Sequence, residues 1–351
     1  MAGLSIAPYL EETRGLVRAE IEALLPRGRY RTLLYDLALD YPLRAAKGLR
    51  PALAIATCRA LGGSLEGVLP TAAVLELYHN AFLIHDDIED GSLLRRGFPT
   101  LHREHGVPVA INVGDALLAL CLQPLLDNTA HVGLGKALRI LEVVARMARE
   151  SAEGQALELD WVRQRRFDQR PRDYLHLVLK KTCHYTFLAP VEVGAIVAGA
   201  TGPQRRALRH FATCLGLAFQ IQDDALNLTA DEALYGKEIG GDLWEGKRTL
   251  ILIDYLAHAE AAERREAERI LAQPMEAKQP AEVRRLLTAI LASGSVDRTR
   301  TVGERFAHKA AAGLAQAAQG GPARTDGGWL LPSQHREFLA GLVDYVLQRD
   351  R

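Results

Sequence analysis

The apolar residues of the chain recur at intervals of three and four, which is the repeat of an amphipathic helix. The stretch containing Val74, Leu75, Tyr78 and Phe82 is typical, because these residues fall on one side of a helix. Alternating β-branched residues, which would indicate strands, are scarce, and aromatic residues make up only 6% of the chain. The pattern therefore predicts an all-α protein.

Breaks rich in glycine, proline and polar residues divide this pattern into about ten segments of helical length. The clearest breaks read LGGSLEG, EDGSLLRRGFP, HVGLG, ATGPQ, LASGS and AQGGPARTDGG. The stretch 257–319 is rich in alanine, glutamate and arginine, which indicates exposed amphipathic helices. The last apolar stretch, LPSQHREFLAGLVDYVLQRD, predicts a closing helix. No repeat or early linker is visible, so we expect one domain over residues 1–351.

The charge balance and the cysteines exclude several classes of protein. The 43 basic and 43 acidic residues cancel, which gives no reason to expect a nucleic-acid partner. The four cysteines are scattered without a CxxC pair, which favours reduced thiols in the cytoplasm over a zinc site or disulfides. No apolar stretch reaches the roughly 18 residues of a membrane helix, and Asp115 interrupts the nearest one. We therefore expect a cytoplasmic protein without a membrane span.

Two patches of carboxylates each follow an apolar helical stretch. Asp86 and Asp90 are four residues apart and share one helical face, with Asp87 beside them. Asp223 and Asn227 repeat that spacing. Asp224 adjoins the second pair. Such acids are costly at the end of an apolar helix unless they are paired or metal-bound. Two facing patches would form an all-oxygen site, which suits Mg²⁺ with phosphate oxygens as its other ligands.

Basic residues occur in separate clusters along the same part of the chain. The clusters contain Lys47 and Arg50, Arg95 and Arg96, Lys180 and Lys181, and Lys237, Lys247 and Arg248. Arginine forks and lysine ammonium groups both suit phosphate oxygens. A ligand set with two polyphosphates and metal ions would account for so many cations beside so many acids.

Together these motifs resemble the trans-isoprenyl diphosphate synthases, the family of farnesyl and geranylgeranyl diphosphate synthases. The motifs KGLRP, ELYHNAFLIHDDIED, LLRRGFPTLHREHG, KKT, FQIQDD, YGKEIGGD and EGK occur in family order between about residues 47 and 247. The stretch HDDIEDGSLLRRG is most similar to the geranylgeranyl type. The resemblance implies a single-domain bundle of helices around a central cavity, and a homodimer.

The resemblance also implies a reaction. An allylic diphosphate (dimethylallyl, geranyl or farnesyl) ionises, isopentenyl diphosphate attacks the cation head to tail, and a proton is lost. By motif, Asp86, Asp90 and Asp223 would hold three Mg²⁺ on the allylic diphosphate, supported by Asp87, Asp224 and Asn227. Electrostatic stabilisation of the leaving diphosphate lowers the barrier to ionisation. The departing diphosphate is the expected base.

The remaining motif residues divide between the two substrates. Those implied for the allylic diphosphate are Arg95, Lys181, Lys237 and Lys247, and those for isopentenyl diphosphate are Lys47, Arg50, His79 and Arg96. Thr182 and Gln220 would stabilise the carbocation with oxygen dipoles. The chain departs from the family at Asn227, which replaces the last aspartate of the second motif, and at Ala45 and Ala46, which replace two glycines.

The helix that leads to Asp86 also predicts the length of the product. Phe82 and Tyr78 lie four and eight residues before Asp86, and therefore one and two turns deeper on the same face. They are either ordinary core residues or a floor that stops the growing chain. Position 81, often decisive in the family, is a small alanine, Ala81. The floor interpretation predicts a fifteen- to twenty-carbon product.

Three alternatives remain open. A class I terpene cyclase shares the fold and first motif, and DDALNLTAD loosely matches its second motif, but it binds one diphosphate and has little use for the residues implied for isopentenyl diphosphate. A non-catalytic subunit of a heteromeric synthase would tend to lose an aspartate motif, and both are usable here. The third is an unrelated metal-binding helical protein.

Overall fold

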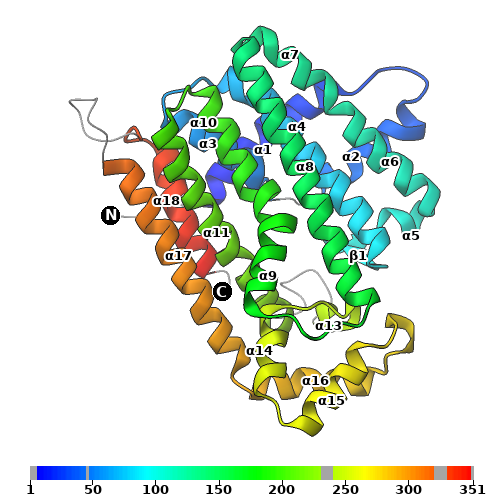
Figure 1. Cartoon of the computed structure of the whole chain (residues 1–351). Coiled ribbons are helices and arrows are strands. Elements are labelled where there is room, and N and C mark those ends of the chain that lie inside the picture. Colours follow the sequence, from blue (N-terminus) through cyan, green and yellow to red (C-terminus); the bar gives the residue numbers. More distant parts are fainter. Residues whose placement is uncertain (1–5, 45–46, 231–239, 320–329, 349–351) are drawn as a thin grey trace. The chain divides into compact units, whose positions relative to one another are not determined.

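The computed structural model describes residues 6–44, 47–230, 240–319 and 330–348. The helices before residue 200 are α1 (Ile6–Leu24), η1 (Arg31–Tyr35), α2 (Asp36–Leu43), α3 (Leu49–Ala60), α4 (Leu65–Glu89), α5 (Leu101–His105), α6 (Val107–Leu120), α7 (Leu122–Val132), α8 (Leu134–Arg163), α9 (Pro171–Val178), η2 (Leu179–Leu188) and α10 (Ala189–Val197). The later ones are α11 (Gly202–Thr229), α13 (Gly241–Glu245), α14 (Leu250–His258), α15 (Ala261–Leu271), η3 (Met275–Ala277), α16 (Pro280–Ala292), α17 (Ser295–Gln319) and α18 (Gln334–Leu347). The all-α prediction and the closing helix are confirmed (Figure 1).

The chain forms two compact units, each assembled from segments that are separate in the sequence. The first unit comprises residues 1–148, 185–212 and 311–342. The second comprises residues 149–184, 213–310 and 343–351. The expectation of one domain over residues 1–351 stays a prediction.

Helix α4 is the central helix of the first unit. It contacts α1, α2, α3, α5, α6, α7 and α10. Its apolar side chains, among them Val74, Leu77 and Ile84, are almost completely buried. Because a helix covered on all sides must be apolar around most of its circumference, the sequence 65–85 has little polar face. The core of this unit therefore fixes the helix that ends in the first carboxylate patch.

Helices α3 and α10 pack against each other at very short range. A Cβ atom added to Gly194 of α10 would lie 2.4 Å from the carbonyl oxygen of Ala54 in α3. Only glycine permits this approach of one helix to the backbone of another. The contact holds the start of α3, which carries Arg50, beside the segment that follows η2.

The only strands among the described residues form a short hairpin after α4. Strand β1 (Leu94–Arg95) pairs antiparallel with β2 (Phe98–Pro99). The two residues between them, Arg96 and Gly97, have φ values of 55° and 80°. Positive φ at both central residues matches the two-residue turn that suits the twist of a hairpin. Arg96 is therefore held in a conformation that non-glycine residues rarely adopt.

Two stretches pass a test of length and apolarity for membrane spans, which the sequence analysis did not expect. They are Leu65–Glu89 and Val107–Val132. In the first, 78% of the apolar window is buried, as in the core helix of a water-soluble fold. In the second, which comprises α6 and α7, only 39% is buried. Several of its apolar residues, among them Leu122 and Leu126, are therefore exposed.

Candidate active site

The first carboxylate patch forms the last turn of α4. The helix begins after Ser64, whose hydroxyl accepts a hydrogen bond from the amide of Gly67 at 3.2 Å. At the other end, the amide of Asp90 donates to the carbonyl of Asp86 at 2.8 Å. The two acids thus lie one turn apart, as their spacing predicts. Both side chains are half-buried, so their carboxylates remain accessible to a bound group.

Asp87 is turned away from that face and into the protein. Its side chain is 0% exposed and accepts a hydrogen bond from the hydroxyl of Tyr41 at 2.7 Å. It also accepts one from Nε of Arg95 at 2.9 Å, and Arg95 lies 3.8 Å from Asp86. Burial disfavours the charged guanidinium, but the hydrogen bonds to Asp87 outweigh it and raise the pKa of Arg95. Asp87 therefore holds a buried arginine beside the accessible acids.

Three arginines lie near enough to the buried imidazole of His79 for their charges to act on it. Burial first, and then the charges of Arg50, Arg96 and Arg95, hold the pKa of His79 well below its ordinary value. The Nδ1 atom of His79 is buried without a hydrogen-bond partner among the described residues. Arg50 donates to Oγ1 of Thr186 at 2.8 Å. A neutral histidine among three fixed cations is a setting that attracts a polyanion.

Arg96 belongs to this cluster through its hairpin. Its Nη1 donates to the carbonyl of Tyr41 at 2.7 Å. Burial lowers the pKa of Arg96, the nearby cations Arg50 and Arg95 lower it further, and the carboxylate of Glu76 opposes them. Arg95 and Arg96 are adjacent in the sequence, yet the first is paired with an aspartate and the second with a backbone carbonyl. The charge of Arg95 is thus partly neutralised by a carboxylate, whereas the charge of Arg96 is not neutralised by its carbonyl partner.

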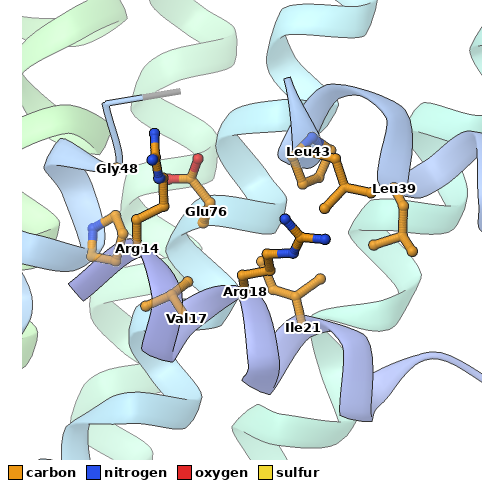
Figure 2. Close-up of a pocket in the computed structure, with 10 residues that line it drawn as sticks. Arg14, Val17, Arg18, Ile21, Leu39, Leu43, Gly48 and Glu76 are labelled. Carbon is orange, nitrogen blue, oxygen red and sulfur yellow. The ribbon is translucent and has the colours of Figure 1, made fainter. Parts of the chain in front are cut away.

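A small pocket of the first unit is lined by residues of α1, α2 and α4 and by the start of α3 (Figure 2). Arg14, Arg18 and Val17 of α1 line it together with Gly48 and Glu76. Its cavity volume is about 20 Å³, which is room for about one water molecule. The buried Oε2 of Glu76 has no hydrogen-bond partner in the described part of the chain. The pocket therefore suits a water that solvates Glu76, and it is too small for a prenyl chain.

The aromatic residues expected on the substrate-facing side of α4 form a row. The rings of Tyr78 and Phe82 are 5.9 Å apart and meet edge to face. Phe82 also meets the ring of Tyr185 at 5.7 Å, and Arg50 lies 4.5 Å above that ring. Tyr78 and Phe82 are half-buried, whereas Ala81 is buried in the core. The sequence analysis missed Tyr185, which joins the arginine cluster to the aromatic row.

The second carboxylate patch lies near the end of α11, in the second unit. Asp223 is half-buried, but Asp224 is only 7% exposed. Asp224 accepts hydrogen bonds from the hydroxyl of Tyr174 at 2.7 Å and from Nε2 of Gln220 at 2.8 Å. Burial, followed by the charge of Asp242, raises the pKa of Asp224, and the two hydrogen bonds oppose that rise. A cation at this patch would relieve the excess of negative charge.

Asn227 uses its side chain to hold the next helix. Its Oδ1 accepts a hydrogen bond from the amide of Asp242 at 3.2 Å, and its carbonyl accepts one from Gly240 at 2.7 Å. The side-chain oxygen expected on a metal thus caps the start of α13. Asp242 was missed by the sequence analysis, although it ends the motif YGKEIGGD. It lies nineteen residues (242 − 223) after Asp223, and no helical spacing connects the two.

The lysines of the motifs are placed unequally. Lys181, on the π-helix η2, forms an ion pair with Glu158 of α8. Lys180 pairs instead with Glu150 at 2.6 Å and with Glu153. Lys247 pairs with Glu245. Lys47 is exposed just before α3, and Lys237 lies outside the described residues.

Thr182 follows Lys181 on η2 and contacts Gln220, one turn before Asp224 of the second patch. Its hydroxyl donates to Oε1 of Gln220 at 2.9 Å. A π-helix has a wider turn than an α-helix and is frequent at functional sites. Gly154 of α8 permits the close approach of the two helices, because a Cβ there would lie 2.4 Å from the backbone nitrogen of Lys181. Thr182 and Gln220, expected to act together, are therefore in direct contact.

The chain matches the family model described as polyprenyl synthetase over residues 32–290. It is 37% identical over 226 residues to a short chain isoprenyl diphosphate synthase of Methanocaldococcus jannaschii, which covers 64% of this chain and 66% of that protein, just under two thirds. It is also 37% identical over 251 residues to a geranylgeranyl diphosphate synthase of Methanosarcina mazei, which covers 72% of this chain and 76% of that protein.

Solved structures match over nearly the whole length of the chain. A geranylgeranyl pyrophosphate synthetase from Pyrococcus horikoshii has a TM-score of 0.84 at 30% identity and covers 98% of each chain. A geranylgeranyl pyrophosphate synthase from Corynebacterium glutamicum has a TM-score of 0.85 at 26% identity, covering 99% of this chain and 100% of the other. That second structure is described as complexed with isoprenyl diphosphate and magnesium.

Proposed function

The chain belongs to the polyprenyl synthetase family, and from that premise we propose that it is a short-chain trans-prenyltransferase. It condenses isopentenyl diphosphate with an allylic diphosphate by head-to-tail 1′-4 coupling and releases a fifteen- to twenty-carbon diphosphate. The observation that carries this proposal is the cluster of Arg50, Arg95 and Arg96 around His79, in the unit that also holds the accessible Asp86 and Asp90. A cyclase that binds one diphosphate has less use for these cations.

The donor set of the two patches fits Mg²⁺. Asp86 and Asp90 of the first patch and Asp223 of the second offer half-buried carboxylate oxygens. Among the described residues, no three acidic, histidine or cysteine side chains gather closely enough to hold an ion alone. Such open sites suit Mg²⁺, which takes one or two carboxylates and completes its shell with water and phosphate oxygens. Three bound Mg²⁺ would stabilise the negative charge that develops on the leaving diphosphate.

The cations then divide between the two substrates. Arg95, oriented by Asp87, binds the allylic diphosphate together with Lys181, Lys237 and Lys247. Lys47, Arg50, His79 and Arg96 bind isopentenyl diphosphate. His79 serves as a neutral hydrogen-bond donor, because its pKa lies well below the ordinary value. Its binding role therefore does not require an imidazolium.

The protein also has to protect the cation that ionisation produces. Thr182 and Gln220, joined by a 2.9 Å hydrogen bond, offer oxygen dipoles to that cation. The aromatic row of Tyr78, Phe82 and Tyr185 excludes water from the growing chain and limits its length. The released diphosphate takes the proton, so no side chain is needed as a general base.

A homodimer is supported by exposed leucines on two consecutive helices. Leu122 and Leu126 of α7 are 58% and 61% exposed, and Leu134 and Leu138 of α8 are 63% and 52% exposed. Exposed apolar residues gathered in this way are typical of protein interfaces. A second copy of the chain would cover them. Burial in such a dimer interface would also account for the exposed apolar residues of Val107–Val132. We further propose a cytoplasmic enzyme without a membrane span.

The test is a product assay with purified protein, Mg²⁺, labelled isopentenyl diphosphate and, in separate reactions, the five-, ten- and fifteen-carbon allylic diphosphates. Label in longer prenyl diphosphates is the expected result, and their length tests the aromatic floor. Release of diphosphate and a hydrocarbon from the allylic substrate alone would instead identify a cyclase. No reaction of either kind would favour the non-catalytic partner subunit.

A further inference from the structure

A chain of three hydrogen bonds, one buried and two partly buried, runs through the second unit and ends at Thr182. The hydroxyl of Tyr174 donates to Oδ2 of Asp224 at 2.7 Å. Nε2 of Gln220 donates to Oδ1 of the same carboxylate at 2.8 Å. The hydroxyl of Thr182 donates to Oε1 of Gln220 at 2.9 Å. Residues from α9, η2 and α11 are thereby joined into one polar network.

The chemistry of the four side chains gives this network a direction. Nε2 of Gln220 faces Asp224, which is the orientation that an ionised carboxylate requires, because it only accepts hydrogen bonds. The carbonyl of the same amide then faces Thr182. A threonine hydroxyl has a single proton, and here that proton is committed to Gln220. The hydroxyl oxygen of Thr182 can therefore still accept a hydrogen bond or face a positive charge. Its proton is no longer available to another acceptor.

The network also explains why Asp224 differs from its neighbour Asp223. Both carboxylate oxygens of Asp224 are engaged by side chains of the same unit, and the residue is nine-tenths buried. Asp223 is half-buried. Two adjacent acids on a helix point about 100° apart, so one of them has to face the interior. The interior acid is the one that Tyr174 and Gln220 hold.

We propose that Tyr174 and Asp224 are positioning residues that act through Gln220 to orient the hydroxyl of Thr182. Their effect is to present the oxygen of Thr182, and not its proton, to positive charge that develops in the bound allylic substrate. This inference rests on the proposed function, because it is the ionisation step that Thr182 serves. Asp224 accordingly supports the reaction without binding a metal ion directly, and its support acts through Gln220.

The test is a double-mutant cycle measured with isopentenyl diphosphate, the best allylic diphosphate and Mg²⁺. Tyr174→Phe removes one hydroxyl and is expected to lower kcat about tenfold, because the reacting groups lose their alignment. The KM of both substrates and the half-saturating Mg²⁺ concentration should stay within about twofold. In a Thr182→Val background the same substitution should change kcat less than about twofold, because its target is gone. In a Thr182→Ser background, which keeps the hydroxyl, the full loss should return.

Two controls make the result specific. Tyr255→Phe alters another buried tyrosine of the same unit, in α14 outside the site, and should leave kcat unchanged. Asp224→Asn keeps an oxygen for Gln220 and should leave the Mg²⁺ requirement unchanged. It serves as the second variant if Tyr174→Phe does not fold.

Three outcomes would overturn the proposal. One is an equal loss of kcat from Tyr174→Phe in all three backgrounds, which would indicate independent action. The second is a Mg²⁺ requirement raised more than about tenfold by Asp224→Asn, which would indicate a metal ligand. The third is a Tyr174→Phe enzyme with wild-type kcat. Inactivity of the wild-type enzyme in the same assay would instead refute the proposed function, so the two failures are distinguishable.

Discussion

The hydroxyl of Tyr41 donates a 2.7 Å hydrogen bond to Asp87, the middle acid of the first carboxylate patch. Tyr174 makes a hydrogen bond of the same length to Asp224, the second of the two acids in the other patch. In both patches the acid beside the accessible aspartate faces the interior, where a charge needs a partner. The same chemical solution thus occurs at the ends of two different helices, in two different units.

The first prediction concerns the buried pair of Asp87 and Arg95. Asp87→Asn removes the anion that neutralises a guanidinium only 7% exposed, and should lower the free energy of unfolding by about 3 kcal/mol. Urea unfolding without substrates or metal measures this change. Asp86→Asn, at a half-buried position one residue away, is the matched control and should cost less than about 1 kcal/mol. Equal losses in the two variants would contradict the pairing.

The second prediction concerns the contact between α8 and η2. Gly154→Ala would place a Cβ 2.4 Å from the backbone nitrogen of Lys181, so the helices must separate, at a cost of about 1–3 kcal/mol. Activity should fall as well, because η2 carries Lys181 and Thr182. Gly135→Ala is the control on the same helix. Nothing lies within 4 Å of a Cβ at that position, and a change within about 0.5 kcal/mol is expected.

The third prediction concerns pH and the buried ammonium of Lys278. Its Nζ donates to the carbonyls of Leu243 and Trp244 at 2.9 and 2.6 Å. Burial, assisted by the charge of Arg248, lowers the pKa of Lys278 from 10.5 to about 8. Between these values the unfolded chain binds more protons than the folded one, so the contribution of Lys278 to stability rises with pH.

Thermal unfolding from pH 7.5 to 10.5 tests that sign. The Tm of the wild type minus the Tm of Lys278→Met should increase as the pH rises through about 8 and level off near 10.5. The wild type thus gains stability relative to the variant. The comparison with the variant cancels the titration of tyrosines and cysteines in the same range. A difference that stays constant across the range would show that Lys278 keeps an ordinary pKa in the folded protein.

The fourth prediction concerns the length of the product. Phe82→Ala removes the first ring of the aromatic row and should lengthen the prenyl chain by at least one five-carbon unit. Chromatography of the dephosphorylated products measures this. Phe98→Ala, at an exposed phenylalanine of the hairpin, is the control and should not change the distribution. An unchanged distribution in Phe82→Ala would make Phe82 and Tyr78 ordinary core residues.

The fifth prediction concerns oligomeric state. Leu126→Glu and Leu138→Glu place a charge among the exposed leucines of α7 and α8, and should convert a dimer into monomers because a buried unpaired charge is costly. Sedimentation velocity measures the change. Leu291→Glu, at an exposed leucine of α16, should leave the dimer intact. A wild-type monomer would refute the proposed interface directly.

The sequence allowed the helices and the accessible acids to be predicted, because both follow from local spacing. Asp86 and Asp90 share a turn, as their spacing predicts. The partners of the interior acids could not be predicted in this way. Tyr41 is 46 residues before Asp87, and Tyr174 is 50 residues before Asp224. Such pairs depend on how distant helices pack.

For the same reason, adjacency along the chain does not determine what a side chain contacts. Asp87, Asp224 and Asn227 stand beside expected metal ligands, but their side chains contact a tyrosine, a glutamine and a helix start. Asp242 is the converse case, since it is distant in sequence yet its charge acts on Asp224. Tyr185 also went unrecognised, because its ring meets Phe82 only once η2 and α10 pack near α4.

The π-helix η2 makes this region sensitive to its number of residues as well as to their identity. Deleting one residue between Leu179 and Leu188 would favour an ordinary α-helix and turn every later side chain by about 100° around the axis. Thr186 would then leave Arg50, even though no functional residue had been substituted. Related proteins should therefore differ more often in the residues of this ten-residue segment than in its length. An insertion or deletion there would indicate that a protein has lost or changed the activity.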